Sequence, residues 1–453
     1  MWAQRAKRFV LEHATELPVS VASALAALNR DPMRVYGRAY AAYRARLAAT
    51  ESHHDNTADT LRIVNHALAR VPYYRDRYGS VEVHSLDEMR ARIGFVDRDE
   101  VGKHAGDFID PQIERAEYDE CTTGGTSGRP LAFLAPKRRY VVEHATMHAL
   151  WARAGYRFDM RAVIRNHRLA GQPYVVNPIT REVIFDGFAL DSPSLSRALD
   201  IILRRELRFI HCYPSTAYEL ARVMERRGIT GRGLTFLSGS ENIYPHQRAL
   251  IEDTLGARFY NWYGHSEKLV LAGYCAATSA YHVEPTYGFF ELVDDRGEAV
   301  TAPGATGEIV GTTLHNPGMP LIRYRTGDLA TYVGDHCDAC GRLLPVFRDV
   351  RGRWNGDRIY RADGGFVTTT ALNLHDELNR AIQGLQYVQE RAGELVVLVI
   401  KGPSFTATHG ERLQRHFVDK LSPADRVEIR FVDQLRRLPN GKFSHLMSSV
   451  DAR

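Results

Sequence analysis

The sequence predicts an α/β fold: a large N-terminal domain with mixed sheets flanked by helices and a β-rich insert, then a small, mobile α+β C-terminal domain. The chain has 453 residues, which is too long for one compact core. From about residue 120, short apolar runs alternate with helical patterns. After about residue 286, strand and turn patterns take over. We place the N-terminal domain at 1–351 and the C-terminal domain at 352–453.

Residues 1–80 are expected to be helical. The stretch "NTADTLRIVNHALARVPYYRDRYG" has apolar residues at helical spacing, followed by a Val-Pro stop. The first 30 residues also have a helical pattern, but no continuous apolar run. This excludes a secretory signal and a transmembrane segment. We expect a docked surface helix there; an amphipathic helix lying on a membrane surface is the alternative.

Composition narrows the class of protein. The net charge of +5 comes without a dense basic tract, so no nucleic-acid partner is expected. Five unevenly spaced cysteines argue against a secreted disulfide scaffold. A cytoplasmic protein with reduced or metal-bound thiols is the expectation.

Four runs between residues 160 and 265 are expected to be strands that each end in a polar loop. They are "RAVIRNHRL", "LRFIHCYP", "LTFLSGS" and "ARFYNWYG", with helical patterns between them. In such sheets ligands bind at the carboxyl ends of the strands. The loops "SGSENIYP" and "YGHSEK" are therefore the predicted site.

The rest of the chain is expected to form an insert and a second unit. "GFFELVDDRGEAVTAPGATGEIVGTTL" reads as strand, turn, loop and strand. Beyond a glycine-bearing hinge near residue 350, "LQYVQERAGELVVLVIKG" predicts a hairpin. "GERLQRHFVDKLS" then predicts a helix, and "DRVEIRFVDQL" a strand.

A glycine-rich stretch, "TTGGTSGRP", buries almost nothing apolar. Its backbone N–H groups and hydroxyls suit the polyphosphate of a nucleotide. It is not a Walker A loop, because no Gly-Lys-Ser/Thr follows at the required spacing. Taken alone, it is equally compatible with a flexible surface loop.

Four motifs in order resemble those of the acyl-adenylate-forming superfamily: "TTGGTSGRP", "FYNWYGHSEK", "IRYRTGDLA" and "LPNGKFSHL". The "VPYYRDRYG" run, "CDACGR" and the length are most similar to the phenylacetate–CoA ligase branch and its capsule-biosynthesis relatives. The resemblance implies an AMP-forming carboxylate ligase. Such an enzyme joins a carboxylic acid to ATP with Mg²⁺, releases pyrophosphate and transfers the acyl group from acyl-AMP.

The resemblance also implies roles for individual residues. Tyr263 would stack on adenine, Asp328 would accept hydrogen bonds from the ribose, with Arg325 nearby, and Glu267 would hold Mg²⁺ and serve catalysis. The full set of implied ATP-binding residues is Thr123, Gly124, Gly125, Thr126, Ser127, Gly128, Gly239, Ser240, Glu241, Tyr263, Gly264, Ser266, Asp328 and Arg353. Leu131 departs from the pattern, because many relatives have Lys after the loop proline; Arg129 is the candidate substitute.

Lys442, in "PNGK", is the implied catalytic lysine; the alternative is an ordinary surface lysine. A mobile C-terminal domain would bring its ammonium between the substrate carboxylate and the α-phosphate, where it offsets negative charge. Asp357 is the candidate hinge residue.

Cysteine spacing predicts a structural zinc site. Cys337 and Cys340 have the spacing of a metal knuckle, and Cys275 with His282 would complete a closed tetrahedral set. His336 or Asp335 could replace His282, and unligated thiols are the alternative. Cys121 and Cys212 are expected to be ordinary buried thiols.

The acyl pocket is expected beside these motifs. Its candidate residues are Tyr140, His144, Tyr213, Pro214, Ser238 and His265. Arg165, His167 and Arg168, at a predicted strand end, could receive an anionic acid or face solvent.

The expected partners are a small carboxylic acid and an acyl acceptor. The resemblance favours coenzyme A as the acceptor. An amine, a sugar hydroxyl or a carrier-protein thiol would make the enzyme an amide or ester ligase, and a non-catalytic nucleotide-binding protein is the alternative from another class. A homodimer is a candidate assembly.

Overall fold

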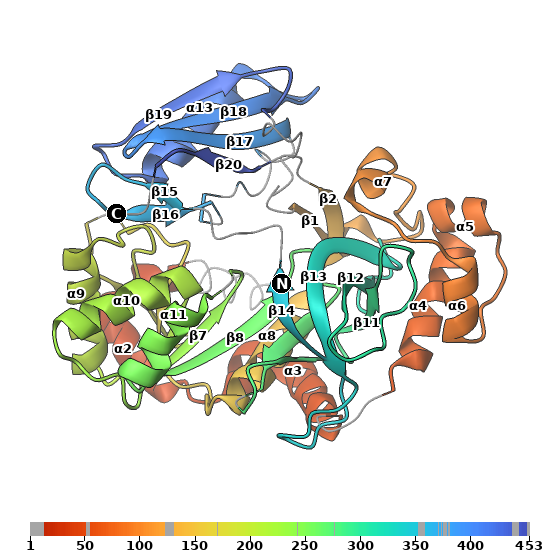
Figure 1. Cartoon of the computed structure of the whole chain (residues 1–453), viewed down its shortest axis with the longest axis horizontal. Coiled ribbons are helices and arrows are strands. Elements are labelled where there is room, and N and C mark those ends of the chain that lie inside the picture. Colours follow the sequence, from red (N-terminus) through yellow and green to blue (C-terminus); the bar gives the residue numbers. More distant parts are fainter. Residues whose placement is uncertain are drawn as a thin grey trace.

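The computed structural model describes residues 13–50, 55–122, 131–169, 171–241, 243–275, 277–351, 358–369, 371–372, 374, 378, 381–436 and 444–450. A twelve-stranded mixed sheet forms the larger part, and a four-stranded sheet with one helix lies above it in Figure 1. The mixed α/β class expected from the sequence is confirmed.

The large sheet runs in the order β11-β12-β13-β14-β10-β9-β8-β7-β6-β3-β5-β4. Its strands are β3 (Arg161–Ile164), β4 (Val175–Asn177), β5 (Glu182–Phe185), β6 (Phe209–Cys212), β7 (Thr235–Gly239), β8 (Arg258–Gly264), β9 (Leu271–Tyr274), β10 (Tyr281–Val283), β11 (Gly288–Val293), β12 (Thr306–Thr313), β13 (Tyr324–Gly334) and β14 (Val346–Arg351).

The parallel part of this sheet contains the four predicted strands. β3, β6, β7 and β8 are parallel neighbours, with β5 on the other side of β3. The crossovers carry α9 (Ser192–Arg204), α10 (Pro214–Arg226), and α11 (Pro245–Ala249) followed by the π-helix η3 (Leu250–Thr254). Because neighbouring parallel strands end at the same edge, the loops after β3, β6, β7 and β8 are brought together.

The β-rich insert continues the same sheet. β8 pairs antiparallel with β9, and the chain of pairs runs through β10, β14, β13 and β12 to β11. The predicted strand–turn–strand is β11 and β12, so that expectation is confirmed. Because the sheet is continuous, β13 belongs to the same sheet as β8, and part of β13 lies on the side where β8 ends.

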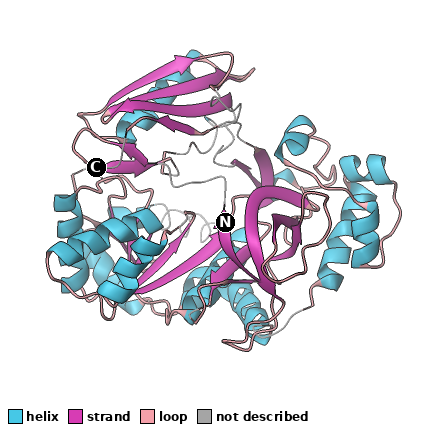
Figure 2. Cartoon of the chain, in the orientation of Figure 1, coloured by secondary structure: helices cyan, strands magenta, loops and turns pink. Residues whose placement is uncertain are grey.

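The described part of the N-terminal region is mainly helical, as expected, whereas residues 1–12 and 51–54 lie outside the described residues. Its helices are η1 (Ala14–Glu16), α2 (Val19–Leu28), α3 (Pro32–Ala49), α4 (Thr57–Arg70), α5 (Pro72–Tyr78), α6 (Leu86–Arg92) and α7 (Arg98–Lys103). Figure 2 shows α4, α5 and α6 standing beside the antiparallel strands. After η2 (Arg115–Glu117), the hairpin β1 (Tyr118–Thr122) and β2 (Ala132–Pro136) leads to α8 (Arg139–Arg153), which packs on α3.

The C-terminal unit has the predicted hairpin, helix and strand. Its sheet order is β19-β18-β17-β20, and a short pair, β15–β16, precedes it. The elements are β15 (Arg358–Tyr360), β16 (Phe366–Thr368), β17 (Ile382–Arg391), β18 (Glu394–Lys401), α13 (Ala407–Lys420), β19 (Arg426–Phe431) and β20 (Leu446–Ser448). Tyr387, Leu413 and Phe417 are fully buried in its core.

The C-terminal unit contacts loops that follow the parallel strands. Phe188, after β5, and Tyr213, after β6, join its hydrophobic core. Arg168, after β3, donates a hydrogen bond to the carbonyl of Leu421 at 2.5 Å. The unit therefore lies over the carboxyl ends of the parallel strands, as Figure 1 shows.

Candidate active site

Tyr263 and Asp328 meet at the edge of the sheet where the parallel strands end. Tyr263, near the end of β8, donates a hydrogen bond of 2.9 Å from its hydroxyl to Oδ2 of Asp328 on β13. Burial, followed by the charge of Asp328, raises the pKa of Tyr263 well above its ordinary value, so the phenol stays a neutral donor. The contact therefore holds the Tyr263 ring next to the Asp328 carboxylate.

The pairing of β12 with β13 is irregular around Asp328. Gly327 adopts a φ of +77°, which favours glycine, and its N–H donates to Glu308 at 2.8 Å. Arg325 also pairs with Glu308, at 2.6 Å. This guanidinium is therefore engaged with Glu308.

Glu267 lies in the turn after β8 and is ionised. Its Oε1 accepts a hydrogen bond from the Tyr324 hydroxyl at 3.1 Å, and its Oε2 lies 3.4 Å from Nδ1 of His265. Burial alone would raise the pKa of this carboxyl. The adjacent His265 ring and then the charge of Arg98 outweigh burial and lower the pKa of Glu267 to about 2. A buried, permanently ionised carboxylate is a hard ligand of the kind that Mg²⁺ prefers.

His265 lies beside Glu267, in the same turn after β8. Its Nε2 accepts a hydrogen bond from the N–H of Val270 at 3.3 Å, which leaves Nδ1 as the proton-bearing nitrogen toward Glu267 when the ring is neutral. The rings of Tyr263 and His265 are 6.0 Å apart between centroids. A Cβ at Gly264, between them in the sequence, would lie 2.9 Å from a terminal methyl group of Leu271, which would have to shift. Ser266 is exposed in the same turn.

The loop after β7 supplies a backbone surface. A Cβ at Gly239 would lie 2.4 Å from the Trp262 ring, so only glycine fits. Ser240 follows with a φ of +71°. The buried carboxylate of Glu241 turns away and accepts a hydrogen bond from the N–H of Ser215, at the start of α10, at 3.2 Å. Burial raises the pKa of Glu241. The backbone of this loop, rather than the Glu241 side chain, faces the strand ends.

Arg165 stands at the end of β3 beside this loop. Its Nη2 donates to the Ser240 hydroxyl at 3.2 Å, and its Nη1 lies 2.7 Å from Nε2 of His211. The guanidinium also lies 4.3 Å from the centroid of the Tyr213 ring. Of the two readings open from the sequence, this geometry favours a site position for Arg165 over a solvent position.

The predicted acyl-pocket residues form two groups. Tyr213, Pro214 and buried Ser238 lie at the strand ends, where Tyr213 donates to Asn166 at 2.9 Å. Tyr140 and His144 lie on α8; Tyr140 is 49% exposed, and the His144 ring is 4.6 Å from that of Tyr36.

Several known proteins are similar to this chain in sequence. A family model of the CapK C-terminal domain matches residues 359–449. The phenylacetate-coenzyme A ligase of Thermus thermophilus is 27% identical over 353 residues, which cover 74% of this chain and 77% of that protein. The enzyme of the same name from Pseudomonas putida is 25% identical over 283 residues, covering 59% and 63%.

Solved structures give the same fold. Two crystal structures of 2-hydroxyisobutyryl-CoA ligase, one in complex with 2-HIB-AMP and one with 2-HIB-AMP and CoA, have TM-scores of 0.54 and 0.53. They are 17% and 19% identical, and the matches cover 86% of this chain and 88% and 90% of theirs. The sequence relatives and the shared fold support the acyl-adenylate-forming superfamily. The chain is phenylacetate–CoA ligase-like, which supports an AMP-forming ligase.

Several residues that the superfamily motifs imply lie outside the described residues. They are Thr123, Gly124, Gly125, Thr126, Ser127, Gly128, Arg129, Arg353, Asp357 and Lys442. The strands on either side of 123–130 are described: β1 and β2 pair antiparallel, with Thr122 opposite Ala132.

A second cluster in this superfamily member has the donor set of a zinc site. The ligand atoms of Cys275, His282, Cys337 and Cys340 all lie within 4.8 Å of one another. Sγ of Cys275 is 3.9 Å from Sγ of Cys337, and Sγ of Cys340 is 3.9 Å from Nε2 of His282. Three thiolates and one imidazole at this spacing fit tetrahedral Zn²⁺ and leave no position for water.

His336, the alternative histidine ligand, differs from His282 in its position and its partner. His336 is largely exposed and pairs with Asp338 at 3.0 Å, outside the cluster. Burial, then Arg153 and Arg342, lower the pKa of His282 to about 4, so its imidazole is neutral at pH 7, as a metal ligand must be. Cys212 is fully buried and burial raises its pKa to about 12, in line with an inert thiol, whereas Cys121 is half-buried.

Some contacts of the site had no signal in the sequence. Lys268 pairs with Glu143 of α8 at 2.8 Å, and the Tyr287 hydroxyl donates to the same carboxylate at 2.6 Å. These contacts hold α8 against the turn that carries Glu267. In the sequence, Lys268 is marked only by its place next to the motif residue Glu267, and nothing there indicates its partner Glu143. Among the described residues no helix is long and apolar enough to cross a membrane.

Proposed function

We propose that this ligase adenylates a small carboxylic acid with ATP, releases pyrophosphate, and transfers the acyl group to coenzyme A. The observation that carries the proposal is the convergence of Tyr263, Asp328 and ionised Glu267 at one edge of the sheet. A nucleotide placed there meets an aromatic face, a ribose-binding carboxylate and a metal-binding carboxylate within one site.

The nucleotide is held by residues with different tasks. The Tyr263 ring and the backbone of Gly239 and Ser240 flank the adenine, and Asp328 accepts the ribose hydroxyls. The Tyr263–Asp328 hydrogen bond fixes the ring and the carboxylate relative to each other, so both are oriented before ATP arrives. Glu267 would hold Mg²⁺, which neutralises charge on the phosphates.

The acid and the catalytic lysine complete the proposal. The acid carboxylate binds between the strand ends and α8, next to His265. We propose that the division at residues 351 and 352 separates two domains, and that the second brings Lys442 to the α-phosphate. The family-model match over 359–449 supports a distinct C-terminal domain. There the ammonium offsets negative charge as the acyl–phosphate bond forms and pyrophosphate leaves.

The zinc cluster has a structural task in this proposal. Cys275 and His282 belong to the segment around β9 and β10, and Cys337 and Cys340 to the loop between β13 and β14. Zn²⁺ held by these four residues would fasten the two segments that carry β9 and β13, the strands beside Glu267 and Asp328.

An acid panel tests the function. Purified enzyme is incubated with ATP, Mg²⁺ and one carboxylic acid at a time, with and without coenzyme A, and pyrophosphate release is followed. Acid-dependent release, with product that needs coenzyme A, is the expected result. Product only with an amine or hydroxyl acceptor would identify an amide or ester ligase. ATP binding without release across the panel would contradict the proposal.

A further inference from the structure

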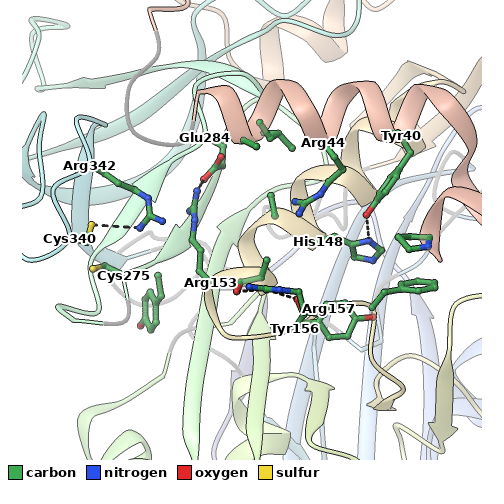
Figure 3. Close-up of a pocket in the computed structure, with 18 of the residues that line it drawn as sticks. Tyr40, Arg44, His148, Arg153, Tyr156, Arg157, Cys275, Glu284, Cys340 and Arg342 are labelled. Atoms are coloured by element: carbon green, nitrogen blue, oxygen red, sulfur yellow. Dashed lines mark hydrogen bonds and ion pairs between the residues drawn. The ribbon is translucent and has the colours of Figure 1, made fainter. Parts of the chain in front are cut away.

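A cavity lies beside the Cys/His cluster, between α3 and the end of α8. Its volume is about 780 Å³, within the range of roughly 300–1,000 Å³ typical of small-molecule sites. It is bounded by α3, the end of α8 with the loop that follows, and the zinc-cluster segments. Figure 3 shows this basic pocket, named for the arginines that line it: Arg44, Arg153, Arg157 and Arg342.

The basic pocket is separate from the nucleotide position. Arg258, the first residue of β8, donates to the carbonyl of Ala154, which directly follows α8, at 3.3 Å. The end of α8 therefore lies at the amino end of β8, whereas Tyr263 lies five residues further along. At about 3.3 Å per residue, Tyr263 lies roughly 16 Å along β8 from the residue that contacts the end of α8. On β9 the pocket reaches Tyr274, two residues from Ala272, the partner of Tyr263.

The charge of the pocket is strongly positive. Four arginines line it against one carboxylate, Glu284, which pairs with Arg153 at 2.5 Å. His148 shares a 2.8 Å hydrogen bond with the Tyr40 hydroxyl, and burial, followed by nearby charges that include Arg44, lowers its pKa to about 2, so it is neutral. The excess is three positive charges. It remains two if a zinc ion joins the three thiolates, because that cluster carries one net negative charge.

The arginines are supported by backbone groups. Arg44 donates to the carbonyl of Ala145 at 3.3 Å, and Arg157 donates to those of Ala152 and Tyr156 at 2.9 and 3.0 Å. Arg342 lies 3.7 Å from Sγ of Cys340. Neutral carbonyls orient the guanidiniums of Arg44 and Arg157 without cancelling their charge, so the charge of these two side chains is available to an anion.

The remaining lining is mostly apolar and includes three aromatic side chains from α3 and the loop after α8. Tyr40, Tyr156 and Phe158 line the pocket and are all buried. A simple phosphate ion would leave most of the volume unfilled, and a single carboxylate would leave most of the charge unmatched. Guanidiniums match phosphate oxygens in bidentate geometry, and aromatic side chains provide surface for a planar ring.

We propose that the basic pocket binds a small organic phosphate of nucleotide size, with its phosphate toward the arginines and its ring toward these aromatic side chains. Nothing in the proposed reaction requires this site. The proposal stands on the cavity, its charge and its position, and it holds or fails independently of the adenylation chemistry.

Calorimetric titration with ADP, in Mg²⁺-free buffer, tests the proposal. Wild type is compared with Asp328→Asn, which impairs the active site, and with Arg44→Gln/Arg157→Gln, which removes two guanidiniums from the pocket. Arg34→Gln/Arg38→Gln is the matched control, because both residues are exposed on α3 outside the pocket. We expect an ADP site that survives Asp328→Asn and the control and weakens at least about tenfold in Arg44→Gln/Arg157→Gln.

Two further arms make the test decisive. If the double variant loses thermal stability, Arg157→Gln alone replaces it, because that residue is exposed; about threefold weaker binding is then expected. Adenosine should bind at least tenfold more weakly than ADP. Citrate that binds as tightly as ADP would overturn the assignment to a ring-bearing phosphate. A single ADP site that disappears in Asp328→Asn, or equal affinity in both double variants, would overturn the pocket itself.

Discussion

The protonation states of individual side chains in this site are set by their neighbours. Glu267 and Glu241 are both glutamates near strand ends, yet the pKa of one is lowered and that of the other is raised. Glu267 lies against His265, and the positive charge of Arg98 acts on it, while Glu241 is buried at the start of α10. This difference suits Glu267 to a cation and Glu241 to a structural contact.

The Asp328→Asn variant should weaken ATP use. An amide retains the shape but loses the charge that strengthens hydrogen bonds from ribose hydroxyls, each worth about 1.5–3 kcal/mol when charged. We expect kcat/KM for ATP to fall by about tenfold or more, with the KM for the acid nearly unchanged. Steady-state kinetics with each substrate varied in turn measures this, and an unchanged kcat/KM for ATP would contradict the ribose role.

The ionisation of Glu267 makes a prediction about pH. Because its folded pKa is lowered to about 2, its contribution to stability is complete above the unfolded pKa near 4.3 and is lost as pH falls toward 2. The difference in unfolding free energy between wild type and Glu267→Gln should therefore shrink between about pH 5 and pH 3. Urea titrations across that interval measure it; a difference that grows toward acid would show that the carboxyl is protonated at neutral pH.

At the level of helices and strands, periodicity predicted most of what positions the site. The runs that became β3, β6, β7 and β8 were expected, since each is a short apolar segment before a polar loop. β5 (Glu182–Phe185) was not, because four residues beside a Gly-bearing loop carry little pattern. That β8 pairs with β9, which joins the insert to the parallel strands, depends on pairing between segments and has no local sequence signal.

The site was predictable only where a motif carried it. Tyr263, Glu267 and Asp328 belong to motifs, and their meeting followed from the resemblance. The pairing of Glu143 with Lys268 depends on how α8 docks. Arg168 was expected to receive an acid or face solvent, yet it contacts the C-terminal unit, because the end of β3 lies beneath that unit.

The zinc cluster joins two strand segments, so its loss should loosen them together. Protein purified without added metal or chelator is expected to contain about one zinc per chain, and Cys337→Ser should reduce this to less than about a tenth, with a lower Tm. Cys121→Ser is the control, since Cys121 lies outside the cluster. Elemental analysis and thermal unfolding measure both effects. Wild type without stoichiometric zinc, or a Cys337→Ser variant that retains it, would contradict the assignment.

Over the whole molecule, the C-terminal unit covers the edge of the sheet where substrates must enter. Its contacts include Arg168, Phe188 and Tyr213 in the loops after β3, β5 and β6, and an ion pair of 3.4 Å between Arg358 and Glu219 of α10. Polar contacts and a small apolar patch can break and re-form more readily than a large hydrophobic interface. Movement of this unit is therefore compatible with the packing, as the proposed delivery of Lys442 would require.

The measurement that tests the central claim most directly separates the two half-reactions in Lys442→Ala. Acid-dependent pyrophosphate release should fall by about 100-fold or more, whereas transfer from pre-made acyl-AMP to coenzyme A should stay within a few-fold of wild type. Lys401→Ala, an exposed lysine on β18 of the same unit, should leave both rates unchanged. Near-normal pyrophosphate release by Lys442→Ala, or equal loss of both half-reactions, would contradict the account.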